Sequence, residues 1–252
     1  IPCYEQIYAL AGPTQTWRIV GGTEIKEDID QTISFLNRYY KDHGPNGGYY
    51  SHIDPVTFDA KAESLGVNKA KKNWNSVGDH APAYLINLYL ATGDENYGRF
   101  LEDTFDTICD HFPDYGYSPF MNEKFFDDWS HDLKWGIHQA RCVVGHNLKV
   151  AWNLTRMHSL TPKESYKTFA HQIADAIPAA GCDNQRGGWY DMMERTLKDG
   201  EENYRRVWHD RKAWWQQEQG ILAYYIMAGV YDDKPEYLNY AREGSAFYNG
   251  WL

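Results

Sequence analysis

The stretch VVGHNLKVAWNL, residues 143–154, decides the fold class because it combines an apolar helical pattern with one polar stripe. His146, Lys149 and Asn153 follow the spacing i, i+3, i+7, which places these three side chains on one helix face. Apolar residues cover most of the other faces. A helix that is apolar nearly all round packs against other helices, so we expect the polar stripe to face an internal cavity.

A helix end, a turn and a new helix recur along the chain at intervals of roughly 70 residues. Glycine followed by aromatic or β-favouring residues recurs in the loops between these units. The first pattern predicts stacked helical hairpins, and the second predicts short β-hairpins on one rim. The helical turns lie in 18–36, 89–108, 157–177 and 227–247, and the glycine loops in 46–54, 114–123 and 186–195.

The pattern predicts an all-α fold of stacked (α/α) helical hairpins that curve, with about eight helices. No linker-like stretch divides the chain, so we expect one domain over residues 1–252. The helices are expected near 4–20, 26–43, 73–92, 96–112, 131–159 with a break near Gly145, 163–179, 211–230 and 235–251.

In stacked hairpins the first helix of each pair lies on the concave side. Three such helices carry polar side chains on otherwise apolar stretches, so we expect these side chains to converge on a common cavity. The residues are Asn75, Asp79 and His80 in 73–92, the polar stripe of 143–154, and Lys212, Trp215, Gln216 and Gln219 in 211–230.

Composition narrows the classes of function. The formal net charge of −10 opposes binding to nucleic acid. The 20 tyrosines and 10 tryptophans are typical of proteins that grip sugars, although most of them would serve a helical core. The four cysteines lack metal-ligand or disulfide spacing, and no apolar run is long enough to span a membrane. We therefore expect a soluble, cytoplasmic protein without a metal or a cofactor.

Three motifs in order resemble the N-acylglucosamine 2-epimerase and cellobiose 2-epimerase superfamily. They are GHNLKVAWNL (145–154), GGWYD (187–191) and KAWWQQ (212–217). The resemblance implies an (α/α)6 toroid that acts on sugars at C2, with this chain as the middle part of such a protein. Lys149 stands where the family usually has glutamate, and Asp79 stands where its histidine would be, with His80 one place along.

Proton transfer next to a carbonyl needs a base and donors that stabilise the enediolate. A neutral histidine suits the first task, and lysine, indole N–H groups and helix starts suit the second. His146 is the best candidate for the base, with Lys149 one turn away. The catalytic candidates are His146, Lys149, Asp79 and His80, and the candidates for sugar contacts are Asn75, Asn153, Trp189, Trp214, Trp215, Gln216, Gln219 and His209.

Each candidate also has a structural interpretation. A buried histidine can bond a neighbouring helix, Asp79 can stabilise a helix dipole, and a tryptophan pair is as often core packing.

The leading hypothesis is therefore a 2-epimerase or aldose–ketose isomerase whose partner is a small sugar. Exposed apolar edges of an open toroid would favour a homodimer. The alternatives are a catalytically inactive sugar-binding protein, or an (α/α)-toroid glycoside hydrolase or lyase using carboxylates such as Asp79, Asp127, Asp128, Asp191 and Glu218.

Overall fold

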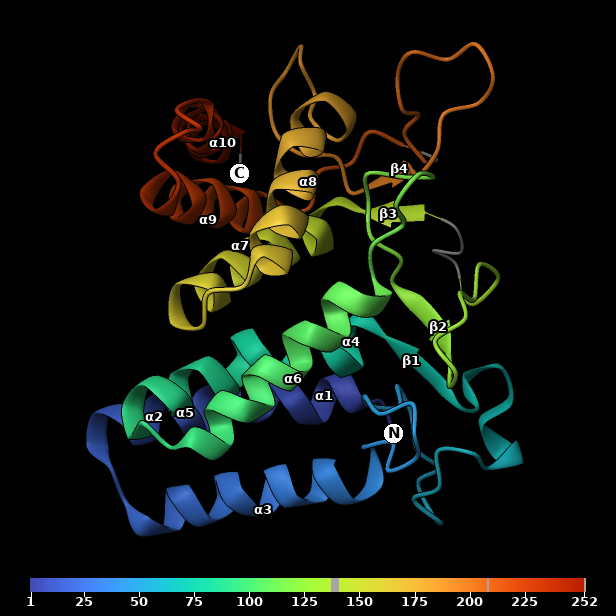
Figure 1. The fold of residues 1–252 in the computed structure, drawn as a ribbon, viewed down its shortest axis with the longest axis vertical. Coiled ribbons are helices and arrows are strands. Elements are labelled where there is room, and N and C mark those ends of the chain that lie inside the picture. Colours follow the sequence, from blue (N-terminus) through green and yellow to red (C-terminus); the bar gives the residue numbers. More distant parts are fainter. Residues whose placement is uncertain (137–140, 208, 252) are drawn as a thin grey trace. The chain divides into compact units, whose positions relative to one another are not determined.

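Helices form most of residues 1–136, 141–207 and 209–251, which are the residues that the computed structural model describes (Figure 1). The chain divides into two compact units. Unit 1 holds Ile1–His111 and Glu123–Gly136, and unit 2 holds Phe112–Asn122 and Ile137–Leu252. The single domain expected from the sequence stays a prediction, and each unit is described by itself.

Unit 1 is built from short helices around a core that includes Leu36, Trp74, Tyr84 and Phe105. α2 packs against α3 and α5, and α1 packs against α4. Its elements are α1 (Cys3–Tyr8), α2 (Ala11–Val20), α3 (Thr23–Tyr39), a 3-10 segment η1 (Glu63–Asn68), β1 (Lys71–Asn73), α4 (Trp74–Val77), a π-helical segment η2 (Ala81–Leu85), α5 (Ile86–Thr92), α6 (Glu95–His111) and β2 (Lys124–Phe126).

Two helices that the sequence predicts as continuous are divided in unit 1. The predicted helix 4–20 forms α1 and α2, and Pro13 lies in the first turn of α2, where a missing N–H is tolerated. The predicted helix 73–92 forms α4, η2 and α5. Pro82 cannot donate the hydrogen bond that would continue α4, and the backbone shifts to π-helical turns there.

Unit 2 contains two helical hairpins, in which α7 packs against α8 and α9 packs against α10. α7 also packs along α9. It is buried on nearly all faces, as the apolar pattern of 143–154 predicts, whereas α8 buries one stripe. The elements are β3 (Arg141–Val143), α7 (Val144–Leu160), α8 (Glu164–Ala180), β4 (Met192–Glu194), α9 (Trp214–Val230) and α10 (Glu236–Trp251).

The predicted helix 131–159 is wrong in its first part. α7 begins at Val144, and 141–143 form β3, which pairs with β4 so that Cys142 faces Met193. Residues 131–136 form a bridge and turns, and 137–140 lie outside the described residues. The apolar residues before Gly145 are thus satisfied by strand pairing rather than by a longer helix.

The expected β structure is present as two small antiparallel sheets. β1 pairs with β2, with Lys72 opposite Phe125, and β3 pairs with β4. The strands pair across roughly 50 residues of sequence rather than within each glycine loop. In both units a helix follows the first strand at once, α4 after β1 and α7 after β3.

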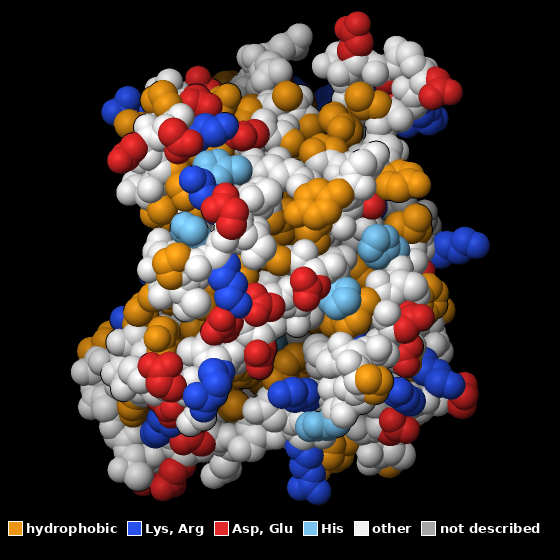
Figure 2. All heavy atoms as spheres, in the orientation of Figure 1, with side chains coloured by type: hydrophobic (Ala, Val, Ile, Leu, Met, Phe, Trp, Pro, Cys, Tyr) orange, Lys and Arg blue, Asp and Glu red, His pale blue; other side chains and the backbone are white. Residues whose placement is uncertain are grey.

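Charged side chains of both signs are interspersed with apolar ones on the face shown in Figure 2. Within the described ranges, none of the helices combines the length and the apolarity that crossing a bilayer requires.

Candidate functional site

The start of α7 lies against the start of α9. The Gly145 amide donates a 2.6 Å hydrogen bond to Oε1 of Gln216. A Cβ atom on Gly145 would lie 2.6 Å from Cγ of Gln216 and 2.7 Å from the ring of Trp215. Glycine at this position therefore permits the close approach that brings α9 beside the next residue, His146.

His146 is half-buried, and its ring centroid lies 5.5 Å from that of Trp215 at an interplanar angle of 44°. Lys149 and Asn153 lie deeper on the same stripe, with exposed fractions of 9% and 0%. Asn153 Nδ2 donates to the Lys149 carbonyl at 2.8 Å, and no described residue donates to its Oδ1. The stripe thus runs from an accessible imidazole to a sealed amide.

Asp191 holds the start of α9 in place. It is buried, and its Oδ1 accepts the Ala213 amide at 2.7 Å and Nε2 of Gln216 at 3.2 Å. Its other oxygen pairs with Arg211. The sequence interpretation gave Asp191 only a hydrolytic role, because no local spacing signals a bond to a helix that starts more than twenty residues later.

Gln219 and the adjacent tryptophans of α9 differ in what they contact. Gln219 Oε1 accepts Nε1 of the buried Trp152 at 2.9 Å, which ties α9 to α7. Trp214 is 58% exposed, whereas Trp215 is half-buried beside His146. Only Trp215 of this pair contacts the imidazole through its ring.

Trp189 is a core residue in unit 2. It is 2% exposed, its ring stacks on Tyr224 at 5.5 Å, and a Cβ on Gly220 would lie 2.0 Å from its Nε1. Its backbone N–H and C=O are both bonded to the side chain of Gln217, which ends the third sequence motif but was not among the candidate site residues. His209 is exposed on the loop before α9.

The candidates of unit 1 gather around the break after α4. Asp79 is fully buried and accepts hydrogen bonds from Asn75 Nδ2 at 3.0 Å and from Tyr8 Oη at 3.3 Å. Burial, followed by the Asp79 carboxylate, raises the pKa of Tyr8 far above its usual range. Asp79 therefore belongs to an internal network.

His80 is sealed among aromatic rings. It is 0% exposed, its Nδ1 lies 2.7 Å from Tyr84 Oη, and its ring centroid lies 4.4 Å from that of Tyr49 and 5.3 Å from that of Phe100. Burial lowers the pKa of His80 to about 3, so the ring is neutral near pH 7. The structural interpretation of this histidine fits its surroundings. The sequence predicts that the candidate residues of unit 1 and those of unit 2 face one common cavity. That arrangement stays a prediction.

The carboxylates proposed for hydrolysis have partners in their own units. Asp127 pairs with Lys61 at 3.4 Å. Asp128 accepts from Ser130 Oγ at 2.6 Å and from its amide, and these bonds lower the pKa of Asp128. Glu218 accepts from Tyr248 Oη at 2.9 Å. Within the described residues, no cluster of three or more His, Cys, Asp or Glu side chains could hold a metal ion.

Scans of the sequence against protein-family models and against curated proteins found no match. Solved structures share the fold. A cellobiose 2-epimerase from Bacillus thermoamylovorans is similar over 100% of this chain and 60% of its own, with a TM-score of 0.77 and 17% identity. A D-mannose isomerase is similar over 98% of this chain and 58% of its own, with a TM-score of 0.71 and 19% identity.

A family 76 glycoside hydrolase, a mannosidase from Bacteroides thetaiotaomicron, also shares the fold. It is similar over 99% of this chain and 61% of its own, with a TM-score of 0.70 and 14% identity. The chain thus spans about 60% of the length of these proteins. The mostly helical fold expected from the sequence, with small two-stranded sheets, is confirmed as one shared with sugar epimerases, isomerases and mannosidases.

Proposed function

We propose that the chain carries the proton-transfer site of a sugar isomerase that acts at C2, either a 2-epimerase or an aldose–ketose isomerase. The reaction removes the proton next to the sugar carbonyl, passes through an enediolate and returns a proton. It needs no redox cofactor, because no electrons leave the substrate.

The observation that carries this proposal is the half-buried imidazole of His146 at the start of α7, against the ring of Trp215. A neutral imidazole can accept a proton near working pH, and a ring partner limits its orientations. Trp215 would also offer a flat apolar face to the sugar ring.

Lys149 and the start of α7 supply the positive charge that an enediolate requires. Lys149 follows His146 by three residues on α7, about one turn, and the first turn of a helix carries partial positive charge. Both would stabilise the developing oxyanion more than the neutral ground state, which is how such donors accelerate proton abstraction. Asn153, Gln216 and Gln219 would act by positioning α7 and α9.

A glycoside hydrolase is the second candidate. The chain shares its fold with a mannosidase and, at 16% identity, with an α-1,6-mannanase studied as an inactive variant in which two consecutive aspartates are replaced by alanine, in complex with α-1,6-mannotetrose. Asp127 and Asp128 are consecutive here. Their bonds to Lys61 and Ser130 favour the isomerase, because both carboxylates already serve local structure.

Incubation with aldoses and ketoses in heavy water tests the proposal. We expect deuterium at C2 of at least one sugar, observed by NMR, and we expect His146→Gln to abolish the incorporation. His158→Gln is the matched control, because His158 lies near the other end of α7. Release of reducing ends from α-mannans without exchange would favour the hydrolase, and ligand-induced thermal stabilisation with neither activity would favour a binding protein.

A further inference from the structure

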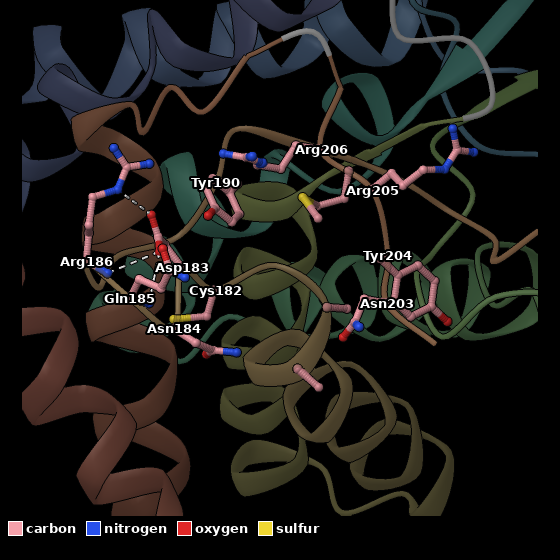
Figure 3. A pocket seen from close by; sticks show the side chains of 13 residues that line it. Cys182, Asp183, Asn184, Gln185, Arg186, Tyr190, Asn203, Tyr204, Arg205 and Arg206 are labelled. Atoms are coloured by element: carbon pink, nitrogen blue, oxygen red, sulfur yellow. Dashed lines mark hydrogen bonds and ion pairs between the residues drawn. The ribbon is translucent and has the colours of Figure 1, made fainter. Parts of the chain in front are cut away.

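A cavity lies in unit 2, between the C-terminal end of α8 and two loops. Its volume is about 590 Å³, within the range of small-molecule sites, roughly 300–1,000 Å³. The side chains that line it come from both loops, from the end of α8 and from Met193 of β4. Figure 3 shows Arg186 on one side and Arg205 and Tyr204 on the other. The proposed chemistry at His146 does not use it.

One wall is built by the loop of residues 182–188. Asp183 is 4% exposed and accepts Nζ of Lys212 at 2.8 Å, Nε of Arg186 at 3.0 Å and two backbone amides. Burial would raise the pKa of Asp183, but the bonds from Lys212 and from the backbone lower it well below its usual range. The carboxylate is thus neutralised by its partners and holds the loop rather than repelling an anion.

The opposite wall is held to the sheet. The Glu194 amide donates to the Arg205 carbonyl at 2.9 Å, and Arg206 forms a bridge with Met193 of β4. Arg206 lies over the ring of Tyr190 at 5.3 Å, and the ring of Tyr204 packs against Phe120 at 5.3 Å. Two guanidinium groups and two tyrosine rings are therefore carried on a backbone that pairing has already ordered.

The three arginines keep donors for a ligand. Arg186 pairs with Asp183 and, at 2.6 Å, with Asp210, and Arg205 pairs with Glu201 at 3.0 Å. Arg206 lies 3.9 Å from Asp210. A guanidinium has five N–H donors, and the side chains of these arginines are 57%, 43% and 48% exposed. In a chain of net charge −10, three arginines and one satisfied carboxylate line this cavity, and Asp210 and Glu201 pair with the arginines from outside the lining.

We propose that this cavity binds a sugar unit that carries a carboxylate, a hexuronate. Arginine pairs with carboxylates through two parallel N–H donors, tyrosine rings accept the apolar face of a pyranose, and the amides of Asn184, Gln185 and Asn203 match hydroxyl groups. A lone inorganic anion would fill little of the volume and would leave the rings unused.

The β3–β4 strand pair connects the cavity to the start of α7. Met193 of β4 lines the cavity and pairs with Cys142 of β3, which leads directly into α7. Tyr190, which also lines the cavity, is followed in the sequence by Asp191, and Asp191 accepts a hydrogen bond from the side chain of Gln216. The proposal concerns binding and does not depend on turnover at His146.

Calorimetry on the whole chain at low salt tests the proposal with four probes, a hexuronate disaccharide, D-glucuronate, D-glucose and sodium sulfate. We expect both uronates to bind, the disaccharide more tightly, and D-glucose to bind at least 10-fold more weakly, because it lacks the group that the arginines recognise. Equal binding of sulfate and D-glucuronate, or no binding of either uronate, overturns the proposal.

Variants distinguish specific binding by the cavity residues from nonspecific attraction to positive charge. Arg205→Ala and Arg206→Ala should each weaken uronate binding about 10-fold, as expected for loss of a charged hydrogen bond. Arg242→Ala is the control, because it removes the same charge from an exposed position on α10 outside the cavity. Tyr204→Ala should weaken the disaccharide more than sulfate. Equal effects of the Arg206 and Arg242 variants would show that only net charge matters and would overturn the proposal.

Discussion

The two units place a histidine that follows a short strand in different surroundings. In each, a three-residue strand leads into a helix with a histidine close by: His80 lies three residues after the end of α4, and His146 lies in the first turn of α7. The helix of unit 1 breaks after four residues and seals its imidazole among aromatic rings, whereas α7 continues for 17 residues and leaves its imidazole half-buried. The same sequence signal, a histidine in an apolar helix, therefore yields a core residue in one unit and a candidate base in the other.

The largest expected difference is catalytic. His146→Gln should lower C2 exchange on the order of 10³-fold, because general-base catalysis contributes factors of this size. His80→Gln should leave the exchange rate unchanged at temperatures where the variant is folded, since its ring is sealed. Rates from NMR in heavy water check both, and equal losses would erase the distinction between the two histidines.

The next largest expected effect is the contribution of the buried His80 to the pH dependence of stability. Below pH 6.5 the unfolded chain protonates His80, while the folded chain does not until about pH 3. The free energy of unfolding should therefore fall with decreasing pH in this window, by about 1.4 kcal/mol per unit from this group.

Urea unfolding at pH 7, 6, 5 and 4 measures this effect as the difference between the parent and His80→Gln. Because other groups titrate in both proteins, the difference isolates the imidazole. Parallel curves would contradict the assignment of a neutral, buried His80.

Two glycines sharpen the comparison of packing. A Cβ on Gly78 would lie 2.0 Å from Cζ3 of the fully buried Trp74, whereas on Gly145 it would meet the half-buried Trp215 and the stem of Gln216. Gly78→Ala should lower the free energy of unfolding by about 3 kcal/mol and Gly145→Ala by about 1 kcal/mol, because overpacking costs most where neighbours cannot move. Gly145→Ala should also slow C2 exchange. Denaturant titration measures the loss of unfolding free energy in each variant. A larger loss for Gly145→Ala would show that the neighbours of Gly78 move more easily than those of Gly145.

The smallest expected effects concern the helix starts. Asn73 caps α4, accepting the Ser76 amide at 2.8 Å, whereas Val143 provides no side-chain cap and Gln216 accepts the Gly145 amide instead. Asn73→Ala and Gln216→Ala should each cost about 1 kcal/mol of stability. Only Gln216→Ala should slow C2 exchange. An equal effect of Asn73→Ala would contradict the idea that the Gln216 bond to Gly145 matters specifically for the candidate site.

Sequence patterns predicted the helices of unit 2 best where burial is continuous. The apolar run around Leu148 and Ala151 predicts α7 correctly, because a helix buried on all sides keeps its pattern without help from distant residues. The same reasoning extended the helix back to residue 131, since Cys142 and Val143 are as apolar as the helix that follows. Their strand partners lie about fifty residues downstream, beyond any local window.

The candidate site was predictable in residue type more than in environment. The stripe of His146, Lys149 and Asn153 was visible from spacing, but its gradient of burial depends on α9. Trp189 was a candidate for stacking on a sugar because of its residue type and its place in the GGWYD motif, whereas its ring fills the space left by Gly220. The roles of Asp191 and Gln217 come from hydrogen bonds between segments that only the fold brings together.

The cap of α7 has a consequence for synthesis on the ribosome. Gln216 lies 71 residues after Gly145, and translation adds roughly 5–20 residues per second, so the first turn of α7 waits several seconds for its acceptor. For most of this interval the nascent helix has neither α9 beside it nor β4 paired to its leading strand. A helper protein that shields apolar segments would find this emerging stretch exposed before the rest of unit 2 is made.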